Sequence, residues 1–242
     1  MKILAVILVL PLIGCGILGI GSQGQLSEVW VVPVVKVRFE GTLTQGDERL
    51  DRIKDFLKDW NARIYDLTDG QIRFAKIEIY NGDQIANTTP GVGTMRETQS
   101  NQGWGQIGLP KTPGYYRFSL HESFTERSYC IGVAAHEWLH AWIGFYDEYK
   151  DSDSSSHCPE DWAKRMETDS CVMDNSWRTE LCRHGSKFHN KNTLQHEKRG
   201  MSCYEWLKKA VGDAGYGTIV IPDKFYCGPD DPPSPTIELK FP

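Results

Sequence analysis

The chain has 242 residues, of which 40% are hydrophobic and 24% charged, and its net charge at pH 7 is -5. That length suffices for one domain with a sizeable core, and the composition is that of a globular protein. The small negative charge does not favour nucleic acid or an anionic membrane surface as a partner.

Residues 1–21 begin with a single lysine and continue as an apolar run too short and too poorly flanked for a membrane-spanning helix. This pattern is typical of a signal peptide and predicts export. Residues 12–15 (LIGC) resemble a bacterial lipobox, whose cysteine becomes the acylated first residue of the mature chain. We therefore expect lipidation at Cys15 and a cell-surface or periplasmic lipoprotein, with the lipid as its only membrane contact. The alternative is ordinary cleavage near Gly21 or Ser22, followed by secretion.

Three segments are expected after the signal peptide. Residues 22–30 form a polar linker, residues 31–222 form one domain, and residues 223–242 form a Pro-rich C-terminal tail, either free or packed at an edge.

Strand and helix signals alternate at the start of the domain. Residues 30–39 are β-branched and predict a strand, and apolar residues spaced three and four apart predict a helix over residues 50–67 that stops at Asp69-Gly70. Residues 71–80 predict a second strand, with a bulge near Ala75 where the apolar phase changes. These signals indicate an α/β domain.

The middle of the chain predicts a loop, a strand and a buried helix. Residues 81–114 are rich in Gly, Asn, Thr, Gln and Pro, which predicts a long loop of the functional or mobile kind. Residues 115–120 predict a strand. Residues 128–144 predict a mostly buried helix, because apolar side chains recur there at helical spacing: Ile131, Ala134, Ala135, Trp138, Leu139 and Trp142.

Six cysteines lie outside the signal peptide: Cys130, Cys158, Cys171, Cys182, Cys203 and Cys227. An even number in an oxidising compartment favours up to three disulfides, whose pairing the sequence does not determine. Metal binding by some thiols is the alternative, and the absence of any CxxC spacing counts against it. We therefore expect a disulfide-stabilised domain.

Residues 136–149 (HEWLHAWIGFYDEY) carry the strongest functional signal. His136 and His140 are four residues apart, so both imidazoles lie on one helix face and can bind one metal ion. Glu137 projects from a neighbouring face, within reach of a metal-bound water. This is the HExxH pattern of zinc hydrolases, with Glu137 as general base. The alternative is a pair of helix histidines satisfied by neighbouring groups.

A catalytic zinc ion needs a third protein ligand and an open position for water. Asp147 follows His140 by seven residues, about 10 Å along a continuous helix, so the chain must leave the helix to bring it to the same ion. Gly144 is suited to end the helix, and Asp147 or Glu148 can then reach the metal. The remaining candidates for the third ligand come from other segments: Glu160, Glu167, His184 and His189.

The spacing from His140 to Gly144 and Asp147 is one residue longer than the usual metzincin pattern. Residues 136–149 closely resemble the metalloprotease domain of the calcium-activated chloride channel regulator family, and weaker likeness covers most of residues 31–210. The resemblance implies a metzincin or zincin-like α/β (α+β) domain, with a mixed twisted sheet packed on the active-site helix. It implies Zn²⁺ as the cofactor, with the two histidines and the aspartate as ligands and the glutamate in catalysis.

Two further roles follow from this resemblance. Cys171-Val172-Met173 looks like the turn that carries a methionine beneath the zinc, with ordinary core packing of Met173 as the alternative. Tyr149, or else Tyr146, is a candidate to stabilise an oxyanion, with packing again the alternative.

The predicted function is that of a secreted or lipid-anchored zinc-dependent endopeptidase, a monomer that acts on protein or peptide substrates. One alternative is a non-catalytic surface binding protein with a structural zinc site. Another is a zinc hydrolase of a non-peptide amide bond, such as a cell-wall bond.

Overall fold

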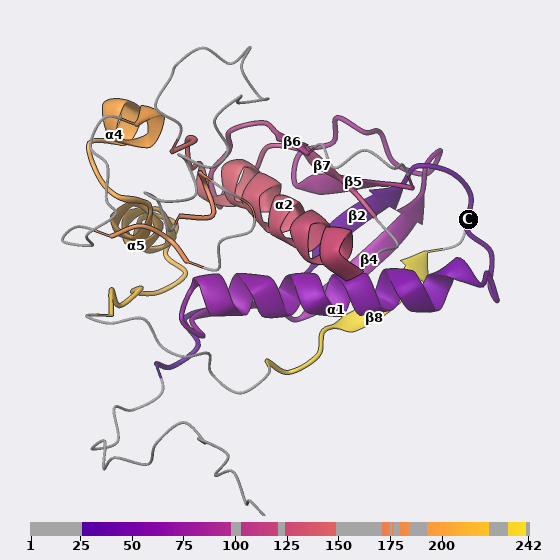
Figure 1. The fold of residues 1–242 in the computed structure, drawn as a ribbon. Coiled ribbons are helices and arrows are strands. Elements are labelled where there is room, and N and C mark those ends of the chain that lie inside the picture. The colour runs from indigo at the N-terminus through magenta and orange to yellow at the C-terminus, as the bar shows by residue number, and fades with distance from the viewer. Residues whose placement is uncertain are drawn as a thin grey trace, which may run out of the picture.

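The computed structural model describes residues 26–97, 103–120, 124–148, 171–174, 176, 180–183, 193–222 and 232–240. They form a mixed α/β architecture in which two long helices cover one face of a sheet (Figure 1). A smaller helical part, drawn in orange to brown, lies beside the end of these helices.

The main sheet has six strands in the order β6-β7-β5-β2-β4-β8. Their bounds are β2 (Val35–Phe39), β4 (Lys76–Asn81), β5 (Val92–Arg96), β6 (Trp104–Gly105), β7 (Tyr116–Ser119) and β8 (Thr236–Lys240). All neighbours pair in parallel except β6, which is antiparallel to β7 at one edge. The sheet is therefore mixed, as predicted. Two short strands, β1 (Trp30–Val32) and β3 (Ile72–Phe74), form a separate parallel pair.

The helices are α1 (Arg49–Leu67), α2 (Phe124–Ile143), α4 (Leu194–Arg199) and α5 (Cys203–Asp213). α1 and α2 contact each other and lie on the same side of the sheet (Figure 1). Trp60 of α1 lies 5.4 Å from Phe118 of β7 between ring centroids, and Trp138 of α2 lies 5.2 Å from Phe74 of β3. The core therefore lies between the sheet and these two helices.

The opposite face of the sheet is polar. Lys76 and Glu78 of β4 form an ion pair of 2.9 Å, and Lys240 and Glu238 of the neighbouring β8 form one of 2.7 Å. Because this face carries charged side chains, only the apolar face of the sheet needs a covering layer. The helices and the candidate site accordingly lie on the apolar side.

The first two predicted strands are each interrupted once. Pro33 divides the first into β1 and β2, because proline has no N–H to offer a strand ladder. Ala75 divides the second into β3 and β4 and donates its N–H to the Val32 carbonyl at 2.9 Å. The predicted bulge near Ala75 is therefore a break at which the chain changes its strand partner.

The prediction of one long loop over residues 81–114 is wrong in part, because β5 and β6 lie within it. β5 is a central strand between β7 and β2. A Cβ atom at Gly93 would lie 2.5 Å from the ring of Tyr116, so close packing against that ring requires glycine. Because Gly93 has no side chain, it also weakens the sequence pattern that would predict strand β5.

The predicted C-terminal tail, residues 223–242, contributes strand β8 to the edge of the main sheet beside β4. Just before this strand, the Asn61 side chain of α1 donates to the Pro233 carbonyl at 3.5 Å. The sheet therefore continues beyond residue 222, the expected end of the domain. Of the two alternatives for the C-terminal segment, free or packed at an edge, the position of β8 agrees with packing at an edge.

The expected disulfides are not supported. Within the described residues, Cys130, Cys171, Cys182 and Cys203 are buried and form no disulfide. The other two, Cys158 and Cys227, lie outside the described residues, as does the predicted lipidation site Cys15. Among the helices of the described ranges, none is long and apolar enough to cross a membrane.

Candidate metal centre

Helix α2 brings the two histidines of the motif together. His136 and His140 are one turn apart on a buried helix face, each only 6% exposed. Their Nε2 atoms lie 2.9 Å from each other, and their rings meet edge to face at 82°. Two nitrogen atoms from successive turns therefore point at one place.

The helix ends where the sequence predicted. Gly144 has a φ of +79°, and its N–H donates to the carbonyls of Leu139 at 3.0 Å and His140 at 3.2 Å. A Cβ atom here would lie 2.4 Å from the Gly108 carbonyl, so both conformation and space require glycine. The chain then leaves the helix axis and turns back toward the histidines.

This turn places Asp147 beside both imidazoles. Its Oδ1 atom is 3.2 Å from Nε2 of His136 and 3.2 Å from Nε2 of His140. The three atoms, which we call the His/Asp centre, form a nearly equilateral triangle. Ligand atoms that share a tetrahedral zinc ion at 2.0–2.1 Å are about 3.3 Å apart, so the triangle has the size that zinc requires.

The other nitrogen of each ring fixes its tautomer. Nδ1 of His136 lies 2.9 Å from the Val172 carbonyl, and Nδ1 of His140 lies 2.8 Å from the Phe145 carbonyl. Because a carbonyl can only accept, both Nδ1 atoms carry hydrogen, and a neutral ring then presents an Nε2 lone pair. Two lone pairs and a carboxylate oxygen facing one another need a cation between them. The donor set therefore fits a metal ion.

In the absence of a metal, a proton must serve as that cation. Burial is the largest single influence and disfavours the charged imidazole, but the hydrogen bond with Asp147, the charges of Glu137 and Asp147 and the Val172 carbonyl together outweigh it and raise the pKa of His136 to about 9. Burial likewise disfavours the Asp147 carboxylate, but the two imidazoles outweigh it and hold the pKa of Asp147 far below its ordinary value. The centre thus has a strong preference for positive charge at its middle.

Glu137 lies beside the centre. Its carboxylate oxygen and the ligand nitrogen atoms of both histidines all lie within 4.8 Å of one another. The side chain is buried, whereas 30% of the Asp147 side chain is exposed to solvent. The described residues therefore combine three converging donors with an adjacent carboxylate.

Edge strand β6 covers this carboxylate. A Cβ atom at Gly103 would lie 2.5 Å from Glu137 Oε1, and one at Gly105 would lie 2.9 Å from Glu137 Oε2 and 2.8 Å from its carbonyl oxygen. Both glycines are therefore needed for the strand backbone to lie against the helix. We did not single out this strand from the sequence, although glycines at alternate positions are a signal of close backbone approach.

The chain after β6 also meets the end of α2. The N–H of Gly108 donates to the His140 carbonyl at 3.0 Å, and that of Gly114 donates to the Ala141 carbonyl at 2.8 Å. The Gly114 bond satisfies a carbonyl that the end of a helix otherwise leaves without a partner, and the Gly108 bond is a second one to the His140 carbonyl. The segment predicted to be a functional or mobile loop thus covers the C-terminal end of α2.

Helices α4 and α5 hold the turn that carries Asp147. Gln195 accepts the Tyr146 N–H with its side chain at 2.8 Å and donates its own N–H to the Asp147 carbonyl at 3.0 Å. Arg199 donates to the Gly144 carbonyl at 2.9 Å and stacks over Tyr146, and Trp206 donates to the Ile143 carbonyl at 2.8 Å. Sequence reasoning missed these supports, because no local pattern connects residues 195–206 with the motif.

The other predicted site residues have mixed outcomes. Met173 lies fully buried in a turn next to Val172, whose carbonyl contacts His136, so this turn meets the His/Asp centre, and the role of Met173 beneath a zinc ion stays a prediction. Tyr146 is half-buried beneath Arg199, which agrees with the alternative that its ring has a packing role. Tyr149 lies outside the described residues, as do the alternative third ligands: Glu160, Glu167, His184 and His189.

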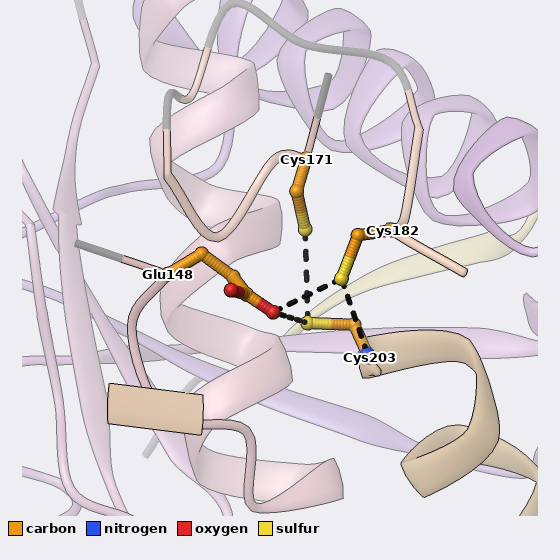
Figure 2. Close-up of side chains that lie close together, drawn as sticks. All are labelled: Glu148, Cys171, Cys182 and Cys203. Atoms are coloured by element: carbon orange, nitrogen blue, oxygen red, sulfur yellow. Dashed lines mark hydrogen bonds between the residues drawn. The ribbon is translucent and has the colours of Figure 1, made fainter. Parts of the chain in front are cut away.

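A second group of buried residues also has the composition of a metal site. It consists of Glu148, Cys171, Cys182 and Cys203, whose ligand atoms all lie within 4.8 Å of one another, and we call it the Cys/Glu cluster (Figure 2). Burial raises the pKa of the Glu148 carboxyl to about 7. The sequence did not group these residues, because they are far apart along the chain.

Comparisons with known proteins do not establish a family. No protein-family profile and no curated protein sequence matches the chain. A solved structure, that of Myroilysin, matches over 48% of this chain and 43% of its own, with 14% sequence identity and a TM-score of 0.27. This chain therefore spans less than half of the length of Myroilysin. A score that low does not show a shared fold, and the resemblance seen around residues 136–149 stays a prediction.

Proposed function

We propose that the protein is a zinc-dependent endopeptidase, whose metal is held by the His/Asp centre. The observation that carries this proposal is the nearly equilateral triangle of His136, His140 and Asp147, in which both Nδ1 atoms are already engaged by backbone carbonyls. Three protein ligands, one of them partly exposed to solvent, are the ligand number of catalytic zinc sites rather than structural ones.

Zinc bound there would lower the pKa of a water molecule toward about 7 and polarise a carbonyl group. Glu137 is placed to take a proton from the attacking water, because its carboxylate lies beside both ligand histidines. The same carboxyl group would then return the proton to the leaving amine. A purely structural zinc site has no use for such a carboxylate, so Glu137 favours hydrolysis over a binding role.

Peptide bonds are the proposed substrate for two reasons. The motif at residues 136–149 resembles that of a protease family, and edge strand β6 runs directly over Glu137. An edge strand has unpaired backbone groups on one side, which an extended peptide can pair with. The apolar run at residues 1–21 adds the proposal that the enzyme acts outside the cytoplasm.

The test is cleavage of a denatured protein mixture by the full chain, with new N-termini identified by mass spectrometry. We expect cleavage that a chelator abolishes and that added zinc restores, and no cleavage by the His140→Ala variant. The matched control is Glu197→Gln, because the side chain of Glu197 is 60% exposed and lies on α4, away from the ligands.

Cleavage by His140→Ala equal to that of wild type would contradict the proposal. A wild-type chain that carries zinc at the His/Asp centre but releases no new N-termini would also contradict it. In that case the same assay on a non-peptide amide, such as a cell-wall fragment, would show whether another bond is hydrolysed.

A further inference from the structure

The Cys/Glu cluster joins four separate segments of the chain. Glu148 follows the turn after α2, Cys171 begins the turn that contains Met173, Cys182 lies two residues after the bridge residue Glu180, and Cys203 is the first residue of α5. The four side chains point toward one another (Figure 2). All are buried, with exposures of 4%, 2%, 5% and 0% in the same order.

The distances between the donor atoms are those of ligands around one ion. Cys171 Sγ and Cys203 Sγ are 3.6 Å apart, well beyond the 2.03–2.05 Å of a disulfide. Two sulfur ligands on a tetrahedral zinc ion with bonds of 2.3 Å are about 3.8 Å apart. Glu148 Oε1 lies 3.0 Å from Cys182 Sγ and 3.4 Å from Cys203 Sγ. A mixed sulfur and oxygen pair on zinc is separated by about 3.5 Å.

A disulfide would not satisfy this group. Pairing any two of the three sulfurs leaves a third thiol and a buried carboxylate. Within the described ranges no lysine or arginine forms an ion pair with Glu148, whose polar neighbours are the thiols and the Thr193 hydroxyl. A buried carboxylate without a cation is costly. One divalent ion would engage all four residues together.

Backbone N–H groups point at two of the three sulfur atoms. The N–H groups of Met173 and Cys182 hydrogen-bond to Cys171 Sγ, and the Cys203 N–H donates to Cys182 Sγ at 3.3 Å. Hydrogen bonds to the ligand atoms are a regular feature around metal-bound ligands.

We propose that the Cys/Glu cluster is a second metal site, structural in role, that takes a thiophilic divalent ion such as Zn²⁺. Four protein donors fill a tetrahedral shell and leave no position for water, which is the form of a structural site. The site would hold the backbone of the first centre in place, because Glu148 follows Asp147 and Cys171 precedes Val172, whose carbonyl orients His136. The Glu148 N–H also donates to the Met173 carbonyl at 3.1 Å, which joins the two segments directly.

The first test is the metal content of the full chain, purified without reductant so that any disulfide is retained. We expect two zinc ions per chain, and one in the Cys182→Ser variant. Cys130→Ser is the matched control, because Cys130 is an equally buried cysteine on α2 outside the cluster, and it should keep both ions. A mass-spectrometric peptide map showing a disulfide between any two cluster cysteines would overturn the proposal.

The second test replaces zinc with Co²⁺ in wild type, which does not depend on any variant folding. Thiolate ligands give cobalt a near-ultraviolet charge-transfer absorption that imidazole and carboxylate ligands do not give. We expect this absorption in wild type and in His140→Ala, so loss of the first centre or of proteolysis leaves it unchanged. A wild-type cobalt spectrum without the thiolate absorption would overturn the proposal.

Discussion

The His/Asp centre and the Cys/Glu cluster are neighbours in the fold but differ in how the chain builds them. The first takes its donors from one continuous segment, residues 136–147, whereas the second collects donors from positions 148, 171, 182 and 203. The first has three donors and an adjacent carboxylate, and the second has four donors and is fully buried. Open and closed shells are the difference between catalytic and structural zinc sites. In the two proposals, the adjacent residues Asp147 and Glu148 would serve two different kinds of site.

The largest effect expected from separating the two sites is on metal affinity. Asp147→Ala removes a charged ligand from the His/Asp centre, so we expect zinc affinity there to fall by more than 100-fold, beyond the loss typical of an outer partner. The thiolate absorption of the cobalt-substituted protein should persist, because no cluster residue is changed. Competition with a chromogenic chelator measures the affinity. Unchanged affinity would assign the third-ligand role to another residue.

The second-largest effect is expected when the contacts that α4 makes with the turn carrying Asp147 are removed. Arg199→Ala removes the hydrogen bond to the Gly144 carbonyl and the stacking over Tyr146 and Trp206. We expect a loss of about 1–3 kcal/mol in the free energy of unfolding and a 10- to 100-fold weaker first zinc site. Lys198→Ala is the matched control, since Lys198 is an exposed neighbour on the same helix. Equal denaturant midpoints and zinc affinities for the two variants would show that Arg199 does not position the turn.

Strand β6 offers a change that separates activity from metal binding. Gly105→Ala would place a Cβ atom 2.8 Å from the Glu137 carbonyl oxygen and 3.0 Å from His140 Cβ, so the strand or the glutamate must shift. We expect kcat to fall by about 10- to 100-fold, with bound zinc unchanged. Gly212→Ala on α5 is the control, because its Cβ would meet nothing closer than 3.9 Å. Equal kcat values in the two variants would exclude a role for the close approach.

The smallest effect is in the pH dependence of zinc binding. His136 has its pKa raised to about 9 in the metal-free chain, so its proton stabilises that state at low pH and is lost as the pH rises through 9. Zinc must displace this proton at neutral pH. We expect release of about one proton per zinc bound at pH 7. Calorimetry in two buffers with different ionisation enthalpies measures it, and binding without release would show that His136 is not a ligand.

The first centre could be found in the sequence because its geometry is local. Helical periodicity puts His136 and His140 on one face, and Gly144 marks where the helix ends, so chain geometry predicted that Asp147 or Glu148 returns to the histidines, and the resemblance favoured Asp147. The order of strands and helices in the first half of the domain was visible for the same reason. Strand β5 was missed, because Gly93 makes room for Tyr116 and thereby removes a β-branched side chain from the pattern.

The Cys/Glu cluster was not visible, because its members are brought together only by the packing of four segments. The even number of cysteines outside the signal peptide favoured disulfides, and the absence of a CxxC spacing argued against a metal site. The CxxC spacing is typical of metal sites built on one local turn. Here a carboxylate and three thiols that are far apart along the chain converge. The capping box of Ser202 and Glu205 marks the start of α5 in the sequence, but it does not indicate what Cys203 faces.

In the proposed mechanism, Glu137 takes the proton from the attacking water at a metal ion that it does not itself bind. The most direct measurement compares zinc content and peptide-bond cleavage in wild type and Glu137→Gln. We predict the same zinc content in both and a kcat lower by about 10²- to 10⁴-fold in the variant, the usual contribution of a general base. Full cleavage by Glu137→Gln with its zinc in place would contradict this account.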